Sequence, residues 1–128
     1  MKPDLHRMLG TQVRIVIDRP IGTKHPKYKS TIYPVNCGFI PKTISGDGRE
    51  VDVYVLGVSE TLKPFTEIEV DIIALIIRDD DQEDKLVGSF AGAVFSEAEI
   101  LSQLEFQEKF FHSRVIMQKS DSSKTLES

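Results

Sequence analysis

The sequence predicts a protein of the α+β class that is mainly β, namely a small OB-like antiparallel barrel with a C-terminal α-helix. Three observations support this fold. Several short stretches have the apolar patterns of strands, breaks rich in Gly and Pro separate them, and one helical signature lies near the C-terminus. The chain of 128 residues, 40% of them hydrophobic, fits one domain at residues 1–117, followed by a disordered tail at 118–128.

The strands follow from alternation and from apolar runs. In residues 12–18, Val13, Ile15 and Ile17 share one face of a half-buried strand. Pro20 and Pro26 then break regular structure, because proline removes a donor and fixes φ. Further strands are expected at 31–33, 52–56, 67–78, 85–87 and 115–117. The loop 79–84 then joins two antiparallel strands.

The one predicted helix begins at a capping box. The Ser96 hydroxyl can accept from the amide of Glu99, whose carboxylate can accept from the amide of Ser96. The helix is expected to continue to about His112. The side chains expected on its packed face are Ile100, Leu101, Leu104, Phe110 and Phe111.

Composition excludes several classes of protein. A net charge of −4 argues against a protein that coats nucleic acid. Cys37 is the one cysteine, so neither an intramolecular disulfide nor a CxxC metal site can form. The N-terminus does not resemble a secretory signal, and no apolar run is long enough to cross a membrane. A cytoplasmic location and no membrane partner are therefore expected.

Two groups of carboxylates are candidates for one site. Asp47 lies in a Gly-Asp-Gly turn with Asp52 just beyond it, and the second group is the run 79–84. An antiparallel barrel could bring both groups to one mouth, where Mg²⁺ would relieve their repulsion and activate water for phosphoryl transfer. Four cations could neutralise the phosphate oxygens: Arg19, Lys24, Lys27 and Lys85. Taken alone, the turn is more typical of an ordinary polar hairpin, and the run 79–84 is more typical of a solvated loop, than either is of a metal site.

Together these segments resemble the family I soluble inorganic pyrophosphatases, especially a short bacterial branch. The matching stretches are IDRPIGTKHPKY at 17–28, YPVN at 33–36, GFIP at 38–41, the turn and aspartates of 46–52, EDKLV at 83–87 and FQEKFF at 106–111. The resemblance is collinear over residues 11 to 117, which makes it more specific than any one motif.

The resemblance implies the barrel fold and Mg²⁺-dependent hydrolysis of pyrophosphate to two phosphates. Asp47 and Asp52 match metal ligands, as does Asp84, with either Asp80 or Asp81 as a further ligand. Lys27 and Lys85 match lysines that bind phosphate. The catalytic set implied is therefore Asp47, Asp52, Lys27 and Lys85.

The chain also departs from the family pattern. Arg49 replaces the carboxylate that activates water, and Cys37 replaces a tyrosine. A hairpin that carries a phosphate-binding arginine is missing, which Lys29 could partly offset. The alternative function is therefore an impaired relative that binds pyrophosphate or another small phosphate compound. An OB-type oligonucleotide binder is disfavoured by the net charge and the absence of Trp, and a homo-oligomer stays open.

Overall fold

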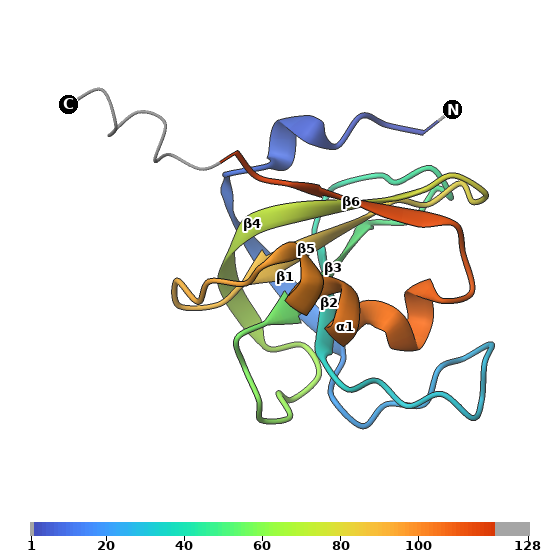
Figure 1. The fold of residues 1–128 in the computed structure, drawn as a ribbon. Helices are drawn as coiled ribbons and strands as arrows, with labels where there is room; N and C mark the ends of the chain where they lie inside the picture. Colours follow the sequence, from blue (N-terminus) through green and yellow to red (C-terminus); the bar gives the residue numbers. More distant parts are fainter. Residues whose placement is uncertain (1, 120–128) are drawn as a thin grey trace.

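A computed structural model describes residues 2–119 (Figure 1). In chain order, the elements of this part of the chain are η1 (His6–Met8), β1 (Gln12–Arg19), β2 (Asn36–Ile40), β3 (Val51–Leu56), β4 (Glu67–Arg78), β5 (Lys85–Ser89), α1 (Glu97–Glu108) and β6 (Ser113–Met117). The predicted strand at 31–33 is reduced to a single bridge between Lys24 and Ile32. Pro34 follows at once and cannot donate to a ladder.

The strands close into a barrel, as the sequence predicts. Their order is β1-β2-β3-β5-β4-β6, and β1 also pairs with β4 to close the ring, which leaves β6 attached outside β4. All the pairings are antiparallel except β3–β5, which is parallel with Val53 opposite Leu86. Because parallel strands start at the same end of a sheet, this pairing places the beginnings of β3 and β5 side by side.

Strand β3 is buried on both faces, which explains its apolar, β-branched composition. Val53 and Val55 point into the barrel, where they pack with residues of β1, β4 and β5. Tyr54 and Leu56 point outward and pack with Ile100 and Leu104 of α1. The barrel and the helix thus share this strand (Figure 1).

The helix is shorter than predicted. Its capping box forms as expected, but α1 ends at Glu108 rather than near His112. Two residues assigned to its packed face are not buried there, since Leu101 is 45% exposed and Phe110 is 38% exposed. Phe110 lies beyond the helix and stacks on Tyr28 at 3.8 Å between ring centroids.

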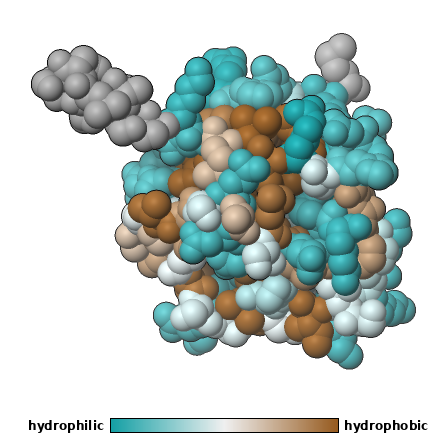
Figure 2. Space-filling model, viewed as in Figure 1, coloured by the Kyte–Doolittle hydropathy of each residue, from teal (hydrophilic) through white to brown (hydrophobic). Residues whose placement is uncertain are grey.

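The surface and the chain ends bear on the remaining predictions. Figure 2 shows hydrophobic residues around β6, bordered by hydrophilic ones. In the described part of the chain, no helix is long and apolar enough to cross a membrane. Of the predicted tail at 118–128, residues 120–128 lie outside the described residues, so the domain boundary stays a prediction.

Gly46 lets the turn that carries Asp47 and the loop 79–84, together the two acidic loops, approach each other. A Cβ added at this residue would lie 1.9 Å from the backbone carbonyl oxygen of Gln82. The exchange Gly46→Ala is therefore expected to force the loops apart and to lower the free energy of unfolding by about 1–3 kcal/mol. Urea denaturation measures this loss.

The matched control is Gly48→Ala in the same turn. A Cβ there would meet nothing within 4 Å, but the positive φ of 86° would strain alanine. The expected cost is about 1 kcal/mol from the backbone alone, and binding of a phosphate ligand should persist. Equal effects of the two substitutions on stability and on ligand binding would contradict the role given to Gly46.

Candidate active site

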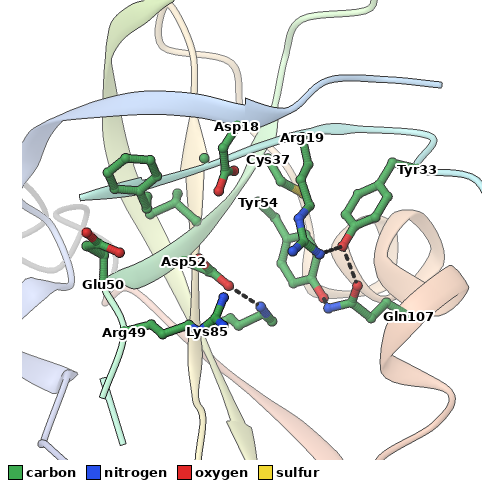
Figure 3. Close-up of a pocket in the computed structure, with 13 residues that line it drawn as sticks. Asp18, Arg19, Tyr33, Cys37, Arg49, Glu50, Asp52, Tyr54, Lys85 and Gln107 are labelled. Carbon is green, nitrogen blue, oxygen red and sulfur yellow. Dashed lines mark hydrogen bonds and ion pairs between the residues drawn. The ribbon is translucent and has the colours of Figure 1, made fainter. Parts of the chain in front are cut away.

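One depression opens where β3 and β5 begin (Figure 3). Its inner part has a volume of about 110 Å³ and its outer part about 310 Å³. The two parts are continuous, because they share the lining residues Arg19, Tyr33, Arg49, Asp52, Lys85 and Gln107. Both acidic loops contribute to the outer part, through Asp47 on one side and Asp81 and Glu83 on the other.

Lys85 holds two carboxylates at the centre of this pocket. Its Nζ donates to Oδ2 of Asp52 at 2.7 Å and to Oε2 of Glu83 at 3.2 Å. The parallel register of β3 and β5 places Asp52 beside Lys85. Glu83 precedes Lys85 by two residues, the spacing that keeps two side chains on one face of an extended segment. The result is a pair of carboxylates facing a single ammonium group.

The three charged groups of this trio change one another's pKa values. Burial acts against the charged form of Lys85, but the Asp52 and Glu83 carboxylates outweigh it and raise the pKa of the amine. Burial also opposes ionisation of Asp52, yet Lys85 keeps the pKa of that carboxyl below its ordinary value. For Glu83, burial combines with repulsion from Asp52 and Asp47, overcomes the attraction of Lys85 and raises the pKa to about 7.

Glu83 should therefore make the metal-free protein less stable as the pH rises. The folded state holds a proton on Glu83 up to about pH 7, whereas the unfolded chain loses it near 4.5. Stability falls wherever the folded state binds more protons, so Glu83 should cost on the order of 2 kcal/mol between pH 4.5 and 7.5. We expect this loss in urea denaturation of the wild type in EDTA, and a smaller loss in Glu83→Gln. Parallel pH profiles of the two proteins would refute the assignment.

Three further cations line the pocket without a carboxylate within 4 Å among residues 2–119: Arg19, Lys27 and Arg49. Arg19 donates instead to the hydroxyl of Tyr33 at 3.0 Å. His25 shapes the loop that carries Lys27, because its Nδ1 accepts the backbone N–H groups of Lys27 and Tyr28 at 3.0 and 3.1 Å. These cations are available to an anion that enters the pocket.

A chain of buried hydrogen bonds supports the wall formed by Arg19. The Tyr33 hydroxyl donates to Oε1 of Gln107 at 3.0 Å, and Nε2 of Gln107 donates to the hydroxyl of Tyr54 at 2.8 Å. The Tyr54 hydroxyl in turn donates to Oε2 of Glu108 at 2.5 Å. Among residues 2–119, no buried side-chain nitrogen or oxygen lacks a hydrogen-bond partner. The network therefore holds Arg19 and its neighbours in one arrangement.

The structure brings together most of the predicted site residues but not all of them. Arg19, Lys27, Asp47, Asp52, Asp81 and Lys85 line the pocket, whereas Lys24, Asp80 and Asp84 do not. Asp80 accepts the backbone N–H of His112 at 3.0 Å. Asp84 accepts from the backbone N–H of Arg78 at 3.0 Å and from Nζ of Lys2 at 2.8 Å. Asp80 and Asp84 therefore support the fold around β4 in this arrangement.

Sequence reasoning missed Glu83, which lines the pocket where Asp84 was expected. The strand period could have identified it, since Glu83 and Lys85 are two residues apart and Asp84 falls on the opposite face. Arg78 and Gln107 were also missed. Their positions depend on partners far away in the chain, for which the sequence gives no local signal.

The donor set fits Mg²⁺ held together with a phosphate ligand. Among residues 2–119, no group of three or more His, Cys, Asp or Glu residues is arranged as a complete metal cage. However, Asp52 and Glu83 are paired carboxylates with one lysine between them, and Asp47 lines the same pocket. Mg²⁺ is commonly bound by one or two carboxylates, with waters and substrate phosphates as its other ligands.

Comparison with known proteins agrees with the resemblance. A family model for inorganic pyrophosphatase matches residues 10–118. An inorganic pyrophosphatase of Saccharolobus solfataricus is 48% identical over 61 residues, which cover 47% of this chain and 35% of that protein. An inorganic pyrophosphatase of Mesorhizobium japonicum is 32% identical over 93 residues, and this match covers 59% of this chain and 52% of that protein. The chain thus spans about half or less of the length of these curated relatives.

Solved structures show the same fold. The pyrophosphatase structure from Ehrlichia chaffeensis superposes with a TM-score of 0.66 at 18% identity, covering 86% of this chain and 88% of that one. The pyrophosphatase structure from Neisseria gonorrhoeae superposes with a TM-score of 0.63 at 19% identity, covering 96% of this chain and 94% of that one. Because the family model matches most of the chain, the sequence-based resemblance is confirmed. The chain belongs to the family I soluble inorganic pyrophosphatases.

Proposed function

We propose that this chain hydrolyses inorganic pyrophosphate to two phosphates with the help of Mg²⁺. One observation supports this most strongly: a pair of carboxylates lines the same pocket as a group of cations that contact no carboxylate within residues 2–119. Carboxylates bind a divalent ion, and cations bind the oxygens of a phosphate polyanion. Family membership gives the reaction class, and the pocket supplies the groups.

Each group has a distinct task in this proposal. Asp52 and Glu83, with Asp47, would hold Mg²⁺, which supplies charge neutralisation and a more acidic bound water. Lys85 would turn from these carboxylates to a phosphate oxygen once a cation takes its place. Arg19 and Lys27 would hold the other phosphate and orient it. The catalytic set is then Asp47, Asp52, Lys27 and Lys85, with Glu83 added.

A second candidate function is binding of pyrophosphate without turnover. Arg49 lines both parts of the pocket, where it offers no base for a water molecule. Cys37 lines the inner part, but burial raises the pKa of its thiol far above the ordinary value, so it is no substitute. The two candidate functions differ in catalysis, not in the ligand.

Release of phosphate separates them. Purified protein is incubated with pyrophosphate and Mg²⁺, and phosphate is measured against a matched sample in EDTA. Mg²⁺-dependent release that Lys85→Ala abolishes supports the hydrolase. No release, together with pyrophosphate binding measured by calorimetry, supports the second function. A cytoplasmic location and self-association remain predictions, which fractionation and light scattering would test.

A further inference from the structure

Arg49 has an unusual place among the cations of the pocket. It lies in the turn before β3 and lines both the inner and the outer part of the pocket. Carboxylates line the same pocket, among them Asp18, Asp47, Glu50 and Asp52. Nevertheless, no carboxylate oxygen within residues 2–119 lies within 4 Å of its guanidinium nitrogens. Within the described part of the chain, the Arg49 guanidinium therefore forms no direct ion pair.

The turn leaves the Arg49 side chain free for a ligand. Asp47 accepts the backbone N–H of Arg49 at 3.0 Å, so this carboxylate orders the turn without pairing with the guanidinium. The backbone of Ser45 also donates to the carbonyl oxygen of Arg49 at 2.6 Å. These bonds hold the Arg49 backbone on both sides. Figure 3 shows its side chain extending toward the pair formed by Asp52 and Lys85.

Three of the acids that line the pocket already have a cationic partner, and the Asp47 carboxylate accepts from Ser45 and from the backbone N–H of Arg49. Asp52 and Glu83 contact Lys85, and Asp81 contacts Arg78 at 3.1 Å. The pocket is therefore lined by three cations that contact no carboxylate within residues 2–119: Arg49, Arg19 and Lys27. Like charges in a partly closed pocket favour a multiply charged anion. A guanidinium also presents paired donors that match two oxygens of a phosphate.

We propose that Arg49 is a substrate-binding residue that, with Arg19 and Lys27, enables the pocket to bind pyrophosphate without a divalent metal. The inference rests on the proposed function for its ligand, but it concerns binding rather than turnover. In this proposal Arg49 contributes directly to binding of the anion. If Arg49 only repelled a metal ion, it would contribute nothing to that binding.

Calorimetric titration with pyrophosphate in EDTA tests this role. Wild-type protein is expected to bind, and Arg49→Gln is expected to bind at least about tenfold more weakly, because a charge-assisted contact is lost. Arg49→Lys should recover part of the affinity. The matched control is Arg7→Gln, which removes the same charge from an exposed residue that contributes to neither part of the pocket. Its affinity should equal that of the wild type.

Two results would overturn the proposal. One is wild-type protein that does not bind pyrophosphate in EDTA. The other is an Arg49→Gln variant that binds pyrophosphate as tightly as the wild type. Arg49 would then only repel a metal ion, and Arg49→Glu should bind more Mn²⁺ than the wild type in electron paramagnetic resonance. Failure of the proposed function would look different, since pyrophosphate would still bind in EDTA while Mg²⁺ produced no phosphate.

Discussion

Replacing Asp52 with asparagine is expected to lower phosphate release from pyrophosphate by on the order of a hundredfold or more. The amide replaces one of the two carboxyl groups that face Lys85. Mg²⁺ would lose a carboxylate ligand, and Lys85 would lose the contact of 2.7 Å that holds it. The measurement is the initial rate of phosphate release over a range of Mg²⁺ concentrations.

A control on β4 separates this effect from a general loss of charge. Asp71→Asn makes the same chemical change at a residue outside the pocket, and its rate should stay near that of the wild type. Thermal unfolding of both variants shows whether the barrel persists. An Asp52→Asn enzyme with an unchanged rate and an unchanged Mg²⁺ dependence would exclude Asp52 from the site.

The elements that the sequence predicts well are those specified by neighbouring residues. The capping box forms as expected, with Oγ of Ser96 accepting from the amide of Glu99 at 3.1 Å. The run that became β3 was predicted from its β-branched residues. Its parallel pairing with β5 was not predicted, because a strand's own residues do not specify its partner. That pairing positions Asp52 beside Lys85.

The site was predictable only in part for the same reason. The family resemblance named Asp52, Lys85 and Lys27, which the structure places in one pocket. The resemblance pointed to Asp84, whereas the period of two along an extended segment places Glu83 on the same face as Lys85. Arg78 at the end of an apolar strand and Glu108 near the end of a helix each resemble solvated charges. Only the folded chain shows that they contact each other.

Glu108→Gln is expected to lower the free energy of unfolding by about 3–5 kcal/mol, because it leaves Arg78 buried without its main partner. The Arg78 side chain is 3% exposed, and its Nη2 lies 2.7 Å from Oε2 of Glu108. Its Nε donates to Oε1 of Glu108 at 3.1 Å, so the pair is bidentate. The hydroxyls of Tyr54 and Ser113 complete the contacts of the carboxylate, each at 2.5 Å. Urea denaturation measures the loss.

Two comparisons identify burial as the cause. The surface pair of Arg14 and Glu67 has side chains that are 64% and 58% exposed, so Glu67→Gln should change stability by no more than about 0.5 kcal/mol. The double variant Arg78→Met with Glu108→Gln also removes the buried guanidinium that has lost its bidentate partner, so it should lose less stability than the sum of the two single variants. Strictly additive losses would contradict the pairing.

The same pair should contribute to unfolding in acid. Burial favours the neutral form of Glu108, but the hydrogen bonds and charge of Arg78 outweigh it and lower the pKa of the carboxyl below its ordinary value of 4.5. A lowered pKa means stability that is fully present above about pH 4.5 and is lost as the pH falls through the folded-state value. Glu108→Gln should therefore lose less stability than the wild type on acidification. The difference in the free energy of unfolding between the two proteins should become smaller as the pH falls. This trend is opposite to that of Glu83, so the two carboxylates can be distinguished in one pair of pH titrations.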